Sequence, residues 1–186
     1  MTAYADLDVS VIDELPPGRT PVRTVVLPDT RRDEVVARID AACRSGRRAY
    51  WVCPLIDESD VVRHQAAEET AAALAAALPN VRIGLVHGRM PGARKDAVMT
   101  AFKAGRLDLL VATTVIEVGV DVPEASLMII ENAERMGLAQ LHQLRGRVGR
   151  GTKGSWCLLL GDQKAEARLR LLERTRDGFL LAEEDL

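Results

Sequence analysis

A repeated alternation of short apolar runs with longer stretches of helical spacing restricts the fold more than any other pattern in this chain. The runs are rich in valine, isoleucine and leucine, and such near-continuous apolar character is typical of strands covered on both faces. Repeated βα units with short connections predict a doubly wound α/β fold, with a mainly parallel sheet flanked by helices. The strand candidates are TVVLP at 24–28, AYWVCPLI at 49–56, RIGLVHG at 82–88, LDLLVATT at 107–114, SLMIIEN at 126–132 and SWCLLLG at 155–161.

The stretches between these runs carry recognisable helix boundaries. Thr30 is expected to cap a helix that ends before Gly46. Pro91 suits the first turn of a helix that Gly105 terminates. Between these two helices, an alanine-rich helix is expected at 61–78.

Three segments follow from these patterns. Residues 1–24 contain Pro16, Pro17 and Gly18 and are expected to form a connector leading into a domain. Residues 25–162 hold the regular βα pattern and form the predicted domain. Residues 163–186 are expected to continue a charged helix and then stop within an apolar–acidic pattern, so the chain is expected to be cut at both ends.

Composition excludes several classes of protein. The formal net charge of −2 argues against a bulk coat for nucleic acid and leaves only local basic patches. The three cysteines are far apart and have no metal-ligand spacing, so no metal site is expected and the thiols are predicted to be buried and reduced. No apolar run reaches the roughly 18 residues of a membrane helix, and no signal peptide is evident. An intracellular protein is expected.

A nucleotide site on such a sheet normally has a glycine-rich phosphate loop, and neither GxxxxGK[ST] nor a GxGxxG that follows a strand occurs in the sequence. The chain is therefore not expected to bind a triphosphate tightly by itself. The acids at 57–60 resemble a metal-binding DExD box, but helix capping is the favoured interpretation because that box requires the missing loop. The acid in IIEN at 129–132 is likewise not expected to bind a metal.

The region LLVATTVIEVGVDVP at 109–123 is a buried strand that runs into a polar turn. Thr113 and Thr114 stand at the carboxyl end of this strand, where open α/β sheets place their ligands. Gly119 permits close approach of the backbone, and Asp121 can accept hydrogen bonds from a sugar hydroxyl. The alternative is a tight connection in which Asp121 only forms the turn.

The segment QLRGRVGRG at 143–151 places arginines between glycines just after a predicted helix. Gln143, Arg145, Arg147 and Arg150 are expected at or beyond the last turns of that helix. Guanidinium groups suit bidentate contact with phosphate oxygens, and neighbouring glycines leave room for the approach. The alternative is a basic loop with ordinary solvated arginines.

His87 follows a strand and precedes the first turn of a helix. A phosphate of a nucleic-acid strand could lie at this helix start, helped by Arg89. The alternative is a structural role, which is more common for a lone histidine at a strand end.

The two motifs ATTVIEVGVDVP and QLRGRVGRG, in this order, resemble motifs V and VI of superfamily 2 helicases. Further segments resemble the RecG branch-migration helicases within that superfamily. These are DLDVSVIDELPPGR after the first motor domain, YWVCPLIDESD at motif IV, HGRMP, and DGFLLAEEDL at the start of the C-terminal TRG element. The resemblance implies the second RecA-like motor domain, with 1–24 as the connector that follows the first one and 163–186 as a helix and the truncated start of TRG.

The resemblance also assigns roles to individual residues. Arg147 and Arg150 match the arginines that reach ATP bound by the first motor domain, with Arg150 preferred as the arginine finger. Gln143 matches the glutamine that helps to couple the two domains. Glu117 matches the motif without an assigned role. The remaining matches are Gly119 and Asp121 near the nucleotide, Thr113 on the DNA backbone, and His87, Gly88 and Arg89 on strand phosphates.

The implied whole enzyme is an ATP-dependent translocase on double-stranded DNA that remodels stalled replication forks and branched recombination intermediates. ATP and Mg²⁺ would be bound mainly by an upstream RecA-like domain, alongside a wedge domain that binds the fork. The resemblance further implies branched DNA as partner, a monomeric state, and a cytoplasmic location with the bacterial nucleoid.

The fragment by itself is expected to be inactive as an ATPase. The alternative is a non-catalytic module of helicase ancestry that binds nucleic acid or protein.

Overall fold

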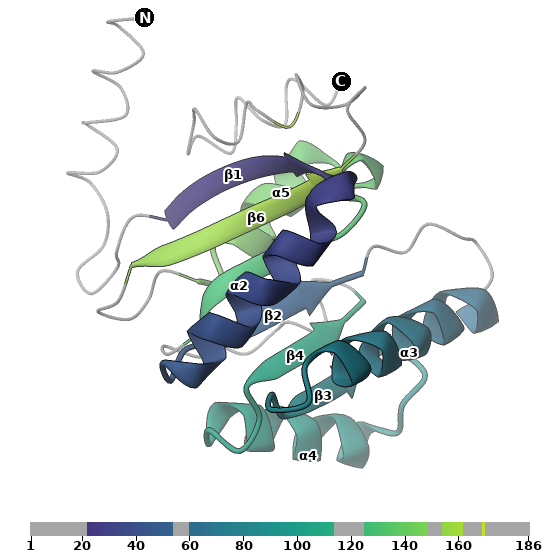
Figure 1. Cartoon of the computed structure of the whole chain (residues 1–186). Coiled ribbons are helices and arrows are strands. Elements are labelled where there is room, and N and C mark those ends of the chain that lie inside the picture. The colour runs from purple at the N-terminus through teal and green to yellow at the C-terminus, as the bar shows by residue number, and fades with distance from the viewer. Residues whose placement is uncertain (1–21, 54–59, 114–124, 149–153, 162–168, 170–186) are drawn as a thin grey trace, which may run out of the picture.

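The computed structural model describes residues 22–53, 60–113, 125–148, 154–161 and 169. These residues contain one sheet of six strands in the order β1-β6-β5-β2-β4-β3, and every paired neighbour runs parallel (Figure 1). This confirms the predicted doubly wound parallel sheet. The strands are β1 Val22–Pro28, β2 Arg48–Val52, β3 Ile83–Val86, β4 Leu109–Ala112, β5 Ala125–Ile130 and β6 Ser155–Gly161.

Helices cover both faces of the sheet, and each face has its own apolar cluster. Helices α2 and α3 lie on one face, while α4 and α5 lie on the other (Figure 1). The helical segments are η1 Asp29–Arg31, α2 Arg32–Arg44, α3 Asp60–Ala77, α4 Gly92–Lys103, η2 Ala133–Arg135 and α5 Leu138–Arg145. Parallel strands need a crossover connection, and a helix that packs on the sheet provides one. This explains why strands and helices alternate along the sequence.

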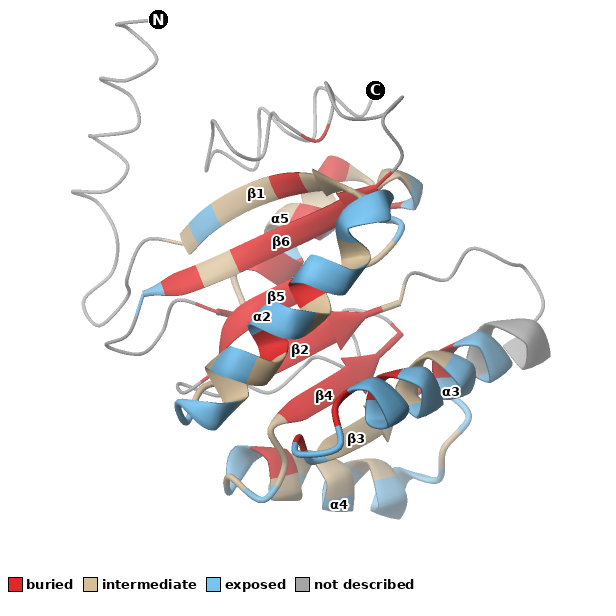
Figure 2. Cartoon of the chain, in the orientation of Figure 1, coloured by how far each residue is buried: buried red, intermediate tan, exposed pale blue. Residues whose placement is uncertain are grey.

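Strand β2 shows how one strand serves both faces. Ala49 and Trp51 belong to the cluster under α2 and α3, whereas Tyr50 and Val52 belong to the cluster under α4 and α5. The ring centroids of Tyr50 and Phe102 of α4 lie 5.2 Å apart. All residues of β4 and β5 are buried, so the centre of the sheet is dry on both sides (Figure 2).

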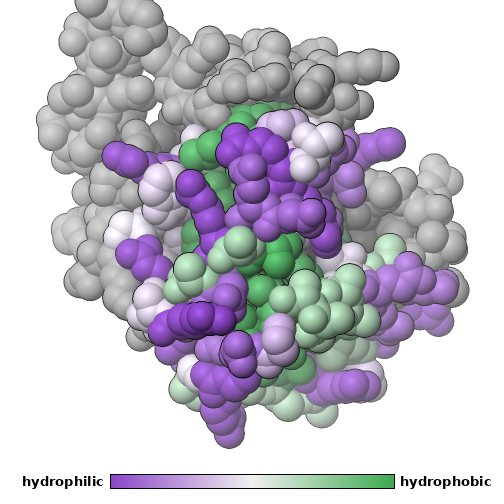
Figure 3. Space-filling model, in the orientation of Figure 1, coloured by the Kyte–Doolittle hydropathy of each residue, from purple (hydrophilic) through white to green (hydrophobic). Residues whose placement is uncertain are grey.

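The surface over this core is mixed. Polar side chains of α2 cover much of the face seen in Figure 3, and apolar groups show between them and along the alanine-rich α3. Arg23 of β1 lies over the half-buried ring of Trp156, with the guanidinium carbon 5.2 Å from the ring centroid. Such stacking covers aromatic surface while the charge stays in water. No helix among the residues that the structure describes is long and apolar enough to cross a membrane.

The helix ends agree with the glycine predictions but not with the predicted cap. Gly46 and Gly105 have φ of +91° and +84°, the left-handed conformation that ends a helix at low cost for glycine. Thr30 lies inside η1, and α2 begins at Arg32 with no side-chain cap, so the prediction of a Thr30 cap was wrong. The 3-10 helix η1 follows β1 directly and includes Thr30, so the α-helix begins only after it, at Arg32.

Two expectations concern the ends of the domain. Strand β1 begins at Val22, three residues before the predicted start of the regular pattern at Val25. The charged helix expected after residue 162 lies outside the described residues, apart from Leu169, which is fully buried in the cluster under α4 and α5.

The three cysteines are free thiols. Cys157 is buried, but Cys43 and Cys53 are only partly buried, so the prediction of three buried thiols was correct for one of them. Burial nevertheless raises the pKa of each thiol to about 12, with nearby carboxylates adding to the effect for Cys43 and Cys53. A neutral thiol is a poor nucleophile, because the thiolate is the reacting form.

Thiol reactivity should therefore be suppressed in the folded chain. At pH 8 an ordinary thiol with a pKa near 8.5 is partly ionised, whereas a pKa of about 12 lowers the thiolate fraction by on the order of 10³. We expect slow maleimide labelling of the native protein and rapid labelling of all three thiols in urea, followed by mass spectrometry. Labelling of Cys53 in the native chain at the rate of a free thiol would contradict this.

Candidate functional site

The ends of four adjacent strands bring polar groups to one edge of the sheet. Val52 of β2 pairs with Ala112 of β4 and with Ile130 of β5. Ala112 also pairs with Val86 of β3. These four strands therefore end at the same level. The residues that follow them are His87 after β3, Thr113 after β4, Cys53 after β2 and Glu131 after β5. This carboxyl edge is where ligands of open parallel sheets bind.

His87 is held at this edge by both ring nitrogens. Its side chain is largely buried, and Nε2 lies 3.3 Å from Oε1 of Glu68 on α3. The backbone N–H of Arg89 donates to Nδ1 at 3.3 Å, so Nε2 is the nitrogen that carries the proton toward Glu68. The imidazole is thus engaged in shaping the turn, and the neighbouring Gly88 and Arg89 are the exposed groups.

The turn after His87 leads into the first turn of α4. Pro91 precedes this helix, no side chain caps it, and no acid lies in its first turn. Arg94 is exposed, and Nζ of Lys95 donates to the carbonyl of Gly88 at 3.3 Å. The positive end of the helix dipole and the cationic residues Arg94 and Lys95 therefore belong to the same helix start, which favours a nearby anion.

Thr113 lies at the same edge, directly after the last residue of β4. It is almost completely buried at 2% exposure and is engaged in a polar interaction. The prediction that Thr113 lies at a strand end is confirmed. Only a small part of its surface is accessible to a ligand.

Glu131 is the organising carboxylate of this edge. Its Oε1 accepts a hydrogen bond from Nε of Arg32 at 2.7 Å, and its Oε2 accepts one from the indole N–H of Trp51 at 2.9 Å. The Arg32 guanidinium also stacks on the Trp51 ring at 5.1 Å, and Sγ of Cys53 lies 3.9 Å from Oε2. Sequence reasoning dismissed this acid as a metal ligand and missed its role in linking β2, β5 and α2.

A second group of predicted residues lies at the end of α5. Gln143 is exposed on this helix, and Arg147 is half-buried in the turn that follows it. The N–H of Arg147 donates to the carbonyl of Leu144 at 2.9 Å, and the N–H of Val148 donates to that of Arg145 at 3.4 Å. We call residues 145–148 the arginine turn.

Arg145 differs from what the sequence suggested. The sequence pattern predicts that Arg145 is available to an anion, but the residue is 5% exposed and contacts Thr24 of β1 and His142 of α5. That expectation was wrong because the last turn of α5 faces the sheet, which draws the Arg145 side chain inward. Helical spacing alone does not predict the inward orientation of Arg145, because that orientation depends on where α5 ends and on how it packs against the sheet.

The predicted residues therefore form two separate groups. His87, Gly88, Arg89 and Thr113 lie along the carboxyl edge, whereas Gln143 and Arg147 lie where α5 ends beside the third residue of β1. Gly119, Asp121 and Arg150 lie outside the described residues, as do Glu117 and most of the acidic segment at 57–60. Among the residues that are described, no group of three metal-ligating side chains occurs.

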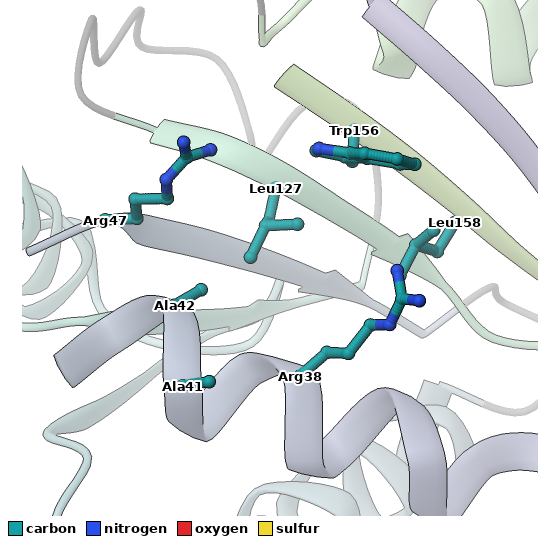
Figure 4. A pocket seen from close by; sticks show the side chains of 7 residues that line it. All are labelled: Arg38, Ala41, Ala42, Arg47, Leu127, Trp156 and Leu158. Atoms are coloured by element: carbon teal, nitrogen blue, oxygen red, sulfur yellow. The ribbon is translucent and has the colours of Figure 1, made fainter. Parts of the chain in front are cut away.

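A hollow of about 350 Å³ opens at the opposite end of the sheet, between α2 and the first residues of β5 and β6 (Figure 4). Leu127, Trp156 and Leu158 line it from the sheet, and Ala41 and Ala42 line it from α2. The guanidinium groups of Arg38 and Arg47 flank it. Arg47 donates to the carbonyl of Gly154 at 2.8 Å. None of the residues predicted to act on nucleotide or DNA lines this hollow.

A parallel six-stranded sheet of this order with helices on both faces is the RecA-like fold of helicase motor domains. Residues 30–152 match the family described as helicase conserved C-terminal domain, and the chain belongs to this family. The chain is 64% identical to the ATP-dependent DNA helicase RecG of Escherichia coli strain E2348/69 over its whole length, and 51% identical to that of Thermotoga maritima over 98% of it. The resemblance predicted from the motifs is thereby confirmed.

Solved structures agree with this assignment. A structure of RecG bound to a three-way DNA junction is 46% identical and covers 92% of this chain and 23% of its own, with a TM-score of 0.76. The Mycobacterium smegmatis helicase Lhr, bound to single-stranded DNA and AMP-PNP, covers 87% of this chain and 23% of its own at 20% identity and a TM-score of 0.59, and shows the fold alone. The chain spans 28% of the length of the E. coli relative and 24% of that of the T. maritima relative.

Replacing Glu131 by alanine should destabilise the domain. Trp51 is fully buried, and the substitution removes the acceptor of its indole N–H. It also removes the ion-pair partner of Arg32. A loss of about 1–3 kcal/mol in the free energy of unfolding is expected in urea denaturation. The matched control Asp40→Ala breaks an i,i+4 pair with exposed Arg44 and should cost less than about 0.5 kcal/mol. Equal losses in the two variants would rule out the organising role of Glu131.

Proposed function

We propose that this chain is the second motor domain of an ATP-dependent translocase on double-stranded DNA that remodels stalled forks and branched recombination intermediates. The observation that carries this proposal is the 64% identity with a RecG helicase over the whole chain. The likeness to RecG bound to a three-way DNA junction supports branched DNA as the substrate. We further propose that the domain acts within a monomer, together with a first motor domain and a wedge domain.

The arginine turn is proposed to face the nucleotide. Arg147 is half-buried at this turn, so its guanidinium is held near the surface by an ordered backbone. With Arg150, it would stabilise the charge that develops on the transferred phosphoryl group, while Gln143 couples the two domains. ATP with Mg²⁺, held mainly by the phosphate loop of the other motor domain, would supply that group. Gly119 and Asp121 are proposed to lie near the nucleotide.

The carboxyl edge is proposed to contact the DNA backbone. The His87 ring is engaged with Glu68 and with the backbone of Arg89, so phosphate contact would come from Arg89 and the backbone at Gly88. Thr113 would add a contact at the neighbouring strand end. Cations and exposed amides at a helix start suit phosphate oxygens without reading sequence.

The arginine finger can be tested in the full-length protein. Arg150→Ala should lower kcat for fork-stimulated ATP hydrolysis by about 10³, while ATP still binds, because a finger acts on the transition state rather than on ground-state binding. Arg31→Ala is a matched control, since Arg31 is exposed and pairs with Glu34 three residues along the chain. A wild-type kcat in Arg150→Ala would remove the finger assignment.

The same assay separates the motor from a binding module. Full-length protein that binds forks but hydrolyses no ATP would support the alternative of a non-catalytic module.

The DNA contact predicts a specific salt dependence. Arg89→Ala should weaken binding to forks of any sequence and reduce the slope of log K against log salt by about 0.9, the value for one lost phosphate contact. Fluorescence anisotropy at several salt concentrations measures this slope. Arg106→Ala is the control, because Arg106 is exposed in the loop before β4, at the opposite edge of the sheet. An unchanged slope in Arg89→Ala would show that Arg89 does not contact phosphate.

A further inference from the structure

Arg145 is a buried cation whose polar contacts include side chains of two different elements. It is the last residue of α5 and is 5% exposed. Its Nη1 donates to Oγ1 of Thr24 in β1 at 3.3 Å, and its Nη2 lies 2.7 Å from Nδ1 of His142. A guanidinium has no acceptor atom, so Nδ1 of His142 must accept and the proton of this imidazole lies on Nε2.

The charge of Arg145 also reaches the neighbouring strand. Burial raises the pKa of the Cys157 thiol, and the positive charge of Arg145 opposes this rise. Cys157 of β6 pairs with Thr24 of β1 in the parallel register. Arg145 therefore lies close to the pair of strands β1 and β6 at the edge of the sheet.

The backbone of Arg145 is part of the arginine turn. Its carbonyl accepts the N–H of Val148, and Val148 is fully buried in the cluster beneath α5. Arg147, between them, is tied to the carbonyl of Leu144. The position of Arg147 therefore depends on where the end of α5 and Val148 are held against the sheet.

Thr24 connects this turn to the edge of the domain. Strand β1 is the outermost strand and pairs with β6 alone among the described strands. It also follows residues 1–21 directly along the chain. A displacement of β1 would thus reach the arginine turn through the contact between Thr24 and Arg145.

We propose that Arg145 is a positioning residue, and that its contact with Thr24 fixes the position of the arginine turn relative to strand β1. The inference rests on the proposed role of Arg147 and Arg150 toward the nucleotide. Arg145 acts on the reaction only through the position of Arg147, since its own guanidinium is buried against Thr24 and His142. The contact makes the placement of Arg147 depend on β1.

The test uses paired variants of the full-length protein. Thr24→Val removes the hydroxyl at nearly constant shape, whereas Thr24→Ser retains it. We expect Thr24→Val to lower kcat for ATP by about tenfold with KM unchanged, and Thr24→Ser to keep the wild-type kcat. Arg145→Ala should lower kcat by roughly 10², the scale of a small misplacement of catalytic groups. Arg44→Ala, whose partner Asp40 lies on the same helix, should change neither constant.

The outcomes separate this inference from the proposed function. Wild-type kcat in both Thr24→Val and Arg145→Ala, with kcat lost in Arg147→Ala, would overturn the positioning role and leave the proposed function standing. Wild-type kcat in Arg147→Ala and Arg150→Ala would overturn the proposed function itself. A purely structural role predicts a lower Tm with unchanged kcat per folded molecule, and this result would also overturn the inference. Because Arg145→Ala removes a buried charge and can unfold the domain, the Thr24 pair decides the matter in that case.

Discussion

Parallel hydrogen bonding between the central strands dictates most other features of this domain. Strand β2 pairs with β4 on one side and β5 on the other, and both pairings run in the same direction. Parallel pairing forces each connection to cross a face of the sheet, so helices bury both faces and all strand ends share one edge. The polar residues after β2, β3, β4 and β5 meet for this reason, although they are far apart in the sequence.

Two charged side chains then connect strands of this sheet to the helices packed on it. Glu131 links the ends of β2 and β5 to the start of α2 through Trp51 and Arg32. Arg145 links the end of α5 to β1 through Thr24. A charge removed from water without partners is costly, so the buried Arg145 and the half-buried Glu131 each stabilise one arrangement of their neighbours and disfavour others.

The separation of the two surfaces fits a motor domain that moves as a rigid body. The carboxyl edge and the arginine turn belong to the same packed sheet, since the helices on both faces have continuous apolar clusters beneath them. In the proposed enzyme, closure around ATP at the arginine turn would carry the carboxyl edge along with it. Domain closure of this kind moves whole elements with little internal change, as expected for a close-packed interior.

Local patterns along the chain were sufficient to predict the class of fold, the six strands and the motif that carries the arginines. These are properties of periodicity and of residue type, which act within a few residues along the chain. The start of α2, the burial of Arg145 and the role of Glu131 became apparent only from tertiary packing. The two side chains depend on partners distant in the sequence: Glu131 meets Trp51 across 80 residues, and Arg145 meets Thr24 across 121. A sequence pattern shows that an arginine or a carboxylate is present, but packing decides whether it faces a ligand or the core.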